Sequence, residues 1–79
     1  MTVNSDAYLA AVASQLNDVD DAVARARVVN DEIAAVATVL EKLGELRADA
    51  VRAARETMSV QTIAAAMGVT RARVYQLIQ

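Results

Sequence analysis

The stretch that decides the fold is VQTIAAAMGVTRARVYQLIQ, residues 60–79. It divides at Gly68 into two short pieces, each with its own apolar stripe at helical spacing. Two short helices that cross at a steep angle need an inward aliphatic residue, a small residue at the point of closest approach, and another aliphatic residue before the turn. Ile63, Ala64 and Met67 meet these needs in order.

The turn and the second helix also have the residues that such a helix pair requires. Gly68 adopts a positive φ without steric cost. Val69 then fills the space at the corner between the two helices. Thr70 is a suitable N-cap for the second helix, and Ser59 is a suitable N-cap for the first helix. Val74 and Leu77 turn inward and close the pair. The sequence therefore predicts two packed helices joined by a tight turn.

This stretch resembles the DNA-binding helix-turn-helix of bacterial and phage regulators. With residues 46–58 as a preceding support helix, it is similar to the trihelical domain at the DNA-binding end of sigma factors. The segment GVTRARVYQL, residues 68–77, also resembles the ends of many small actinobacterial and phage or plasmid regulators. The resemblance covers residues 46–79 and leaves residues 1–45 without a counterpart.

The resemblance implies that the second helix lies in the major groove of double-stranded DNA and that its early outward residues reach base edges. Arg71 is suited to guanine, Gln76 to adenine, and Ala72 to a thymine methyl group. Base-edge contacts are thus expected for Thr70, Arg71, Ala72, Tyr75 and Gln76, and phosphate contacts for Gln61, Thr62, Arg52 and Arg55. Two other interpretations stay open. Arg47, Arg52 and Arg55 also fit a solvated helix face, and Arg73 fits a role in solvent or in an ion pair.

Two further helices are expected before this region. Residues 5–16 form an amphipathic segment that the pair Asn17-Asp18 interrupts. From Asp18 onward, apolar residues recur at alternating steps of four and three if Asn30 is counted with them, which is heptad spacing. This seam is the predicted dimer interface and comprises Val19, Val23, Ala26, Asn30, Ile33, Ala37 and Leu40. Gly44 leaves open whether the helix ends there or continues.

Composition supports an all-α chain and narrows its function. There is no Pro, and only two Gly interrupt abundant helix formers. No Cys and no His are present, which excludes thiol chemistry, disulfides, Cys/His zinc sites and imidazole catalysis. The apolar residues are mostly Ala and Val, with no Phe or Trp, so a single copy buries little area and self-association is expected.

The two parts of the chain differ in net charge. Residues 1–46 carry three basic and eight acidic residues, a net charge of −5, whereas residues 47–79 carry five Arg and two acids, a net charge of +3. The acids at Asp18, Asp20 and Asp21 lack the spacing of a calcium loop, and they and the pair Asp31-Glu32 are best explained as first-turn acids of a helix. We therefore expect no metal site, no cofactor and no enzymatic activity.

The sequence predicts an all-α protein with a coiled-coil-like helical hairpin for dimerisation in residues 1–45 and a trihelical helix-turn-helix in residues 46–79. The expected function is that of a homodimeric transcriptional regulator that binds a palindromic DNA site. With no basic region before Arg25 to act as a secretory signal and no membrane span, we expect a cytoplasmic, nucleoid-associated protein. The alternative is a protein-interaction module, such as an antitoxin, an anti-activator or a sigma-binding adaptor, that works through the acidic helices. A chromosome-coating protein is a weaker alternative, since low overall basicity disfavours nonspecific DNA binding.

Overall fold

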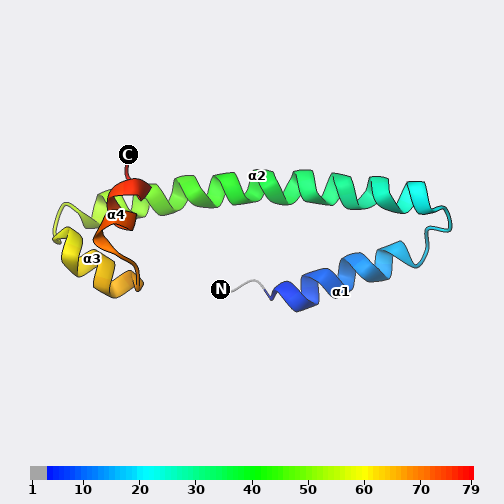
Figure 1. Ribbon diagram of the computed structural model, residues 1–79, viewed down its shortest axis with the longest axis horizontal. Coiled ribbons are helices and arrows are strands. Elements are labelled where there is room, and N and C mark those ends of the chain that lie inside the picture. The colour runs from blue at the N-terminus through cyan, green and yellow to red at the C-terminus, as the bar shows by residue number, and fades with distance from the viewer. Residues whose placement is uncertain (1–3) are drawn as a thin grey trace. The chain divides into compact units, whose positions relative to one another are not determined.

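The computed structural model describes residues 4–79 and consists of helices within that range, with no strand (Figure 1). The chain divides into two compact units, Met1–Ala37 and Thr38–Gln79. The helices are α1 (Ser5–Leu16), α2 (Ala22–Ala54), α3 (Val60–Met67) and α4 (Arg71–Leu77). The expected all-α class is confirmed. No helix of residues 4–79 is both long and apolar enough to cross a membrane.

In the first unit, α1 lies alongside the first part of α2 and runs in the opposite direction (Figure 1). The Asn4 side chain caps α1 by accepting a hydrogen bond from the Ala7 amide at 3.1 Å. The bounds of α1 agree with the prediction. No side chain of residues 4–37 is fully buried, so this unit has no closed core of its own.

The start of α2 corrects the sequence prediction. The helix begins at Ala22, so Val19 lies in the connection between the helices and not in a helical seam. Arg25 holds this connection, because its Nη1 donates to the carbonyls of Val19 and Asp20 at 2.9 Å each. The Asp21 carboxylate accepts from the first backbone amides of α2, as expected of an acid at a helix start. The pair at residues 31–32 lies well inside α2, so its assignment to a first turn was wrong.

α2 continues through Gly44 without a break. One glycine inside a helix costs about 1 kcal/mol, which its neighbours Leu43 and Glu45, both good helix formers, help to offset. The helix ends at Ala54, four residues before the expected boundary, and a tight turn leads from there to Ser59. Ser59 is the predicted N-cap of α3, with extended backbone and a side chain that accepts from the Thr62 amide at 3.1 Å.

The core of the second unit lies where α2, α3 and α4 meet. It consists of Val51, Val60, Ile63, Ala64 and Val74, of which Val74 is completely buried. Val69 and Leu77 are half-buried, whereas Met67, which was expected in the core, is 40% exposed. Met67 instead lines an apolar groove of about 340 Å³ together with residues of α2 and α3. Val51 belongs to the apolar stripe that helical spacing predicts for residues 46–58, whereas Val60 was not expected in the core.

Candidate nucleic-acid interface

The turn between α3 and α4 fixes the direction of α4. Gly68 has φ 72° and ψ 32°, the left-handed conformation predicted for it. The Val69 amide donates to the Ala64 carbonyl at 3.0 Å, which satisfies a carbonyl at the end of α3. The Thr70 hydroxyl accepts from the Arg73 amide at 3.1 Å and caps α4, as expected. Hydrogen bonds thus define both the end of α3 and the start of α4.

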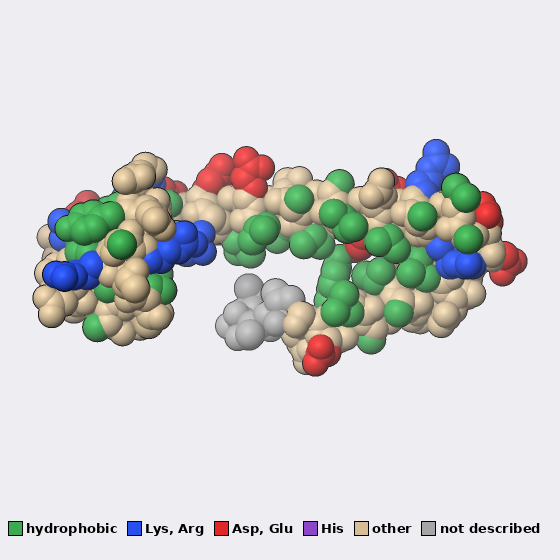
Figure 2. Space-filling view, in the orientation of Figure 1, with side chains coloured by type: hydrophobic (Ala, Val, Ile, Leu, Met, Phe, Trp, Pro, Cys, Tyr) green, Lys and Arg blue, Asp and Glu red, His purple; other side chains and the backbone are tan. Residues whose placement is uncertain are grey.

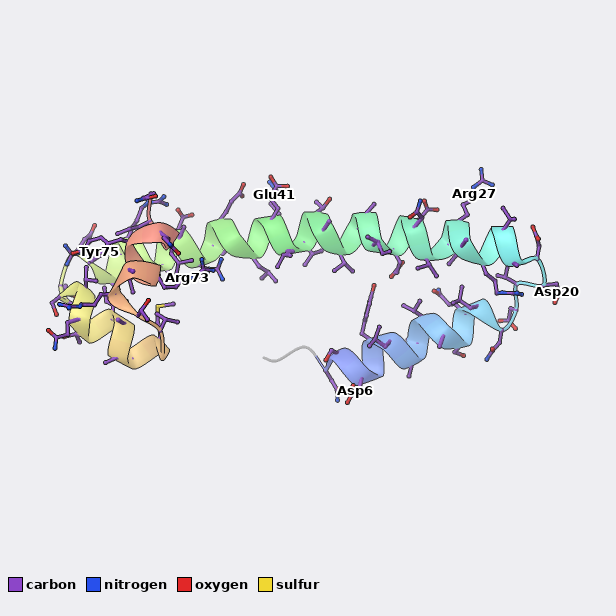
Figure 3. All side chains as sticks on the ribbon, viewed as in Figure 1. Asp6, Asp20, Arg27, Glu41, Arg73 and Tyr75 are labelled. Atoms are coloured by element: carbon purple, nitrogen blue, oxygen red, sulfur yellow. The ribbon has the colours of Figure 1, made fainter. Side chains whose placement is uncertain are left out.

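Burial fixes which side of α4 faces outward. Successive helical residues are rotated by about 100°, so the completely buried Val74 sets the inward direction of the whole helix. Ala72 and Gln76 then lie opposite Val74, at the centre of the exposed face. Arg73 and Tyr75 flank that centre on opposite sides (Figure 3), and Tyr75 is 53% exposed. The structure therefore presents an outward face on α4 with polar, small and aromatic side chains.

The predicted base-contacting residues lie together on this element. Four residues of α4 and the cap residue before it are exposed: Thr70, Arg71, Ala72, Tyr75 and Gln76. No acid occurs after Glu56 in the sequence, and Arg71 and Arg73 form no ion pair with any residue from 4 to 79. Both guanidinium groups are therefore available to an anionic partner. Arg73 was set aside by the sequence analysis, yet it lies as far from the buried direction as Tyr75 does and belongs among the candidates.

The residues expected to contact phosphates come from two other elements. Gln61 and Thr62 are exposed in the first turn of α3, and the Thr62 hydroxyl shares a 2.9 Å hydrogen bond with the Ser59 hydroxyl. Arg52 and Arg55 lie at the end of α2 and just beyond it. Both already have partners within the chain, which the sequence did not reveal.

The partners of the two arginines differ in kind. Arg52 Nη1 lies 3.2 Å from Asp49 Oδ1, in an exposed pair of the sort that contributes little free energy. Arg55 Nη1 donates to the Met58 carbonyl at 3.1 Å and so stabilises the connection to α3. Arg52 can exchange its partner for a phosphate at small cost, whereas Arg55 also has a structural role.

The predicted dimer seam is exposed along α2. Val23 is 76% exposed, Ile33 61% and Leu40 68%, and Ala26, Asn30 and Ala37 are exposed as well. Figure 2 shows hydrophobic side chains at the surface along this helix. A helix with so much exposed apolar area is typical of one that packs against a partner.

A side-chain hydrogen bond joins α1 to α2. The Tyr8 hydroxyl donates to Glu32 Oε1 at 2.6 Å, and this hydrogen bond to a carboxylate raises the pKa of Tyr8 above its ordinary value of 10.0. Beside it, a groove of about 390 Å³ is lined by apolar residues that include Leu9, Val12 and Val36. The hairpin of the first unit is therefore open on one side.

Comparison with known proteins gives no relative: no family model, no curated protein and no solved structure matches the chain. The function must therefore be argued from the residues and their geometry.

Proposed function

We propose that this protein is a transcriptional regulator that binds double-stranded DNA in a sequence-specific manner, as a homodimer, through a helix-turn-helix formed by α3, the turn at Gly68 and α4. One observation carries the proposal. The buried Val74 side chain and the Thr70 cap hold α4 in one orientation, and the exposed residues of α4 include two arginines without ion partners in residues 4–79 and no acid. A helix of this kind suits the major groove, where side chains at its start meet base edges.

Each residue predicted to contact bases has a role in this account. Arg71 donates two hydrogen bonds to guanine, Gln76 pairs with adenine, and Ala72 contacts a thymine methyl group. Tyr75 and Thr70 contact neighbouring bases or the adjoining sugar-phosphate backbone of the DNA. Because Ala72 and Gln76 lie at the centre of the outward face, they approach the base pairs most directly.

Phosphate contacts position the helix on the duplex. Gln61 and Thr62 at the start of α3, together with Arg52, serve this purpose. Arg55 contributes through the guanidinium donors that its bond to the Met58 carbonyl leaves free. These contacts give affinity on every sequence and no discrimination.

Dimerisation supports the same function. A single α4 of seven residues makes few base contacts, and a two-fold axis doubles them on a palindromic site. The exposed seam of α2 supplies the surface for it. Replacing Ile33 and Leu40 together by Asp places charges in an apolar seam and is expected to give monomers or unfolded chain in sedimentation. A folded monomer of the unchanged protein at high micromolar concentration would contradict the dimer.

The direct test of function is selection of bound sequences from a random pool of duplexes. Enrichment of a palindrome is the expected result. A regulator of this kind is expected at the nucleoid in the cytoplasm. A pool that stays random after several rounds contradicts sequence-specific binding.

The second candidate is a protein-interaction module that works through the first unit. The observation that favours it is the acidic, apolar and incompletely covered hairpin of α1 and α2. Such a module, an antitoxin or sigma-binding adaptor for example, would capture a protein partner in a pull-down while the DNA selection yields no enriched sequence.

A further inference from the structure

The proposed homodimer leaves open how two copies meet, and the placement of α1 on α2 limits the choices. α1 lies on the side of α2 that carries Val29, Glu32 and Val36, where the Tyr8 hydrogen bond and the groove are found. Ile33 and Ala37 of the seam also line this groove, so the seam borders the α1 side of the helix, and its residues stay exposed. A second α2 that packs on the seam therefore lies beside α1 and shares Ile33 and Ala37 with the groove.

Two charged residues border the seam on its other side. Arg27 and Glu41 are both exposed residues of α2. They lie two heptads apart, which keeps them on one face of the helix. Neither forms an ion pair within the described part of the chain, residues 4–79. A seam with one basic and one acidic border residue is complementary to a reversed copy of itself.

We propose that two copies associate through their α2 seams in antiparallel orientation, with the two-fold axis passing near residue 34. This proposal rests on the homodimer of the proposed function and specifies its geometry. In an antiparallel pair, the positions that border the seam on one side face each other across the axis. Arg27 of each copy then faces Glu41 of the other, and the dimer has two such pairs. Shifting the register by one heptad in either direction loses both pairs.

The sizes of the seam residues support the same orientation. In this register Ile33 faces Ala37 of the second copy, and Leu40 faces Asn30. These two layers each combine a larger and a smaller side chain, which fills space evenly at the centre of the interface. At the ends of the seam Ala26 faces Gly44, and this layer of two small residues leaves room for an added Cβ.

A parallel pair fits the same residues less well. It places identical residues opposite each other, so that a layer of two alanines at Ala37 lies between a layer of two isoleucines at Ile33 and a layer of two leucines at Leu40. The alanine layer then leaves a cavity, because the layers of larger side chains hold the two helices apart. In the parallel arrangement, no acidic residue of the second copy lies beside Arg27. Only the pairing of Asn30 with Asn30 favours the parallel arrangement.

Cysteine crosslinking tests the orientation directly, because the chain contains no Cys. In the antiparallel pair the two Leu40 positions lie about 15 Å apart along the axis, too far for a disulfide. Leu40→Cys alone is therefore expected to give no disulfide dimer, whereas a mixture of Leu40→Cys and Asn30→Cys chains is expected to give one. A disulfide dimer of Leu40→Cys alone, or none in the mixture, overturns the proposal.

Charge reversal gives a second measurement that leaves the seam unchanged. Glu41→Arg sets two arginines against each other twice in the dimer and should raise its dissociation constant about tenfold. Adding Arg27→Glu should restore the dissociation constant to within about threefold of the unchanged protein. A double variant as weak as the single one contradicts the pairing.

DNA titration of the same proteins separates this inference from the proposed function. Salt-dependent DNA binding combined with homotypic Leu40→Cys crosslinks overturns only the orientation. The absence of binding to any duplex overturns the proposed function even where the mixed crosslink forms.

Discussion

The two glycines of this chain offer a matched test, because the same substitution is expected to act in opposite directions. Gly68 has φ 72°, in the left-handed region, and a Cβ added there would meet no atom within 4 Å. The cost of Gly68→Ala is therefore the backbone strain alone, about 1–2 kcal/mol. Gly44 lies inside α2, where a Cβ would meet only Arg47 Nη2 at 4.0 Å. Gly44→Ala should stabilise the chain by about 1 kcal/mol through helix propensity.

Urea unfolding followed by circular dichroism measures both effects at one protein concentration, which matters because association also stabilises the folded chain. The free energies of unfolding of the two variants should differ by about 2–3 kcal/mol, the sum of the two effects. Gly68→Asn serves as a control, since Asn tolerates the left-handed region better than Ala and should lie between the parent and Gly68→Ala. Variants that change stability in the same direction would refute the placement of the turn.

Two further predictions concern the core of the second unit and the hydrogen bond between α1 and α2 in the first. Val74→Ala removes two methyl groups from the one completely buried side chain among residues 4–79 and should lower the free energy of unfolding by about 2–3 kcal/mol, whereas Val39→Ala, at a position 56% exposed, should change it by less than about 0.5 kcal/mol. The hydrogen bond from Tyr8 to Glu32 raises the pKa of Tyr8 above 10.0, so its stabilisation is present below pH 10 and is lost as the pH rises through the raised pKa. Glu32→Ala should lower the midpoint of the phenolate absorbance titration, and an unchanged midpoint would exclude this bond in solution.

Much of the second unit could be predicted because its positions are restricted locally. A positive φ at Gly68 and caps at Ser59 and Thr70 depend on a few neighbouring residues, and all three are confirmed. The inward positions Ile63, Ala64 and Val74 follow from helical spacing in the same way. Local sequence rules are sufficient to predict these positions, because the tight turn permits few backbone conformations.

Features that depend on where α2 begins, ends and passes could not be predicted in this way. The exposure of Met67 depends on where α2 passes, and Arg55 acquires its role from the Met58 carbonyl only because α2 ends at Ala54. Heptad spacing extended the seam to Val19, but apolar spacing alone does not show where a helix begins. The capping carboxylate of Asp21 determines that boundary.

The measurement that tests the central claim most directly is DNA affinity over several salt concentrations, on a selected duplex and on its scrambled counterpart. The account predicts that log affinity falls linearly with log salt for both duplexes. Arg71→Ala should reduce the preference for the selected duplex about tenfold or more, as the loss of a guanine contact requires. Arg52→Ala should weaken both duplexes alike and reduce the salt slope by about 1 for each contact.

Lys42→Ala is the matched control, because it removes one positive charge from an exposed position of α2 away from the turn and α4. It should leave the preference between the two duplexes unchanged. If Arg71→Ala lowers both affinities equally, the assignment of α4 to base recognition is wrong. If the unchanged protein shows no salt-dependent binding to any duplex, the DNA-binding account as a whole is contradicted.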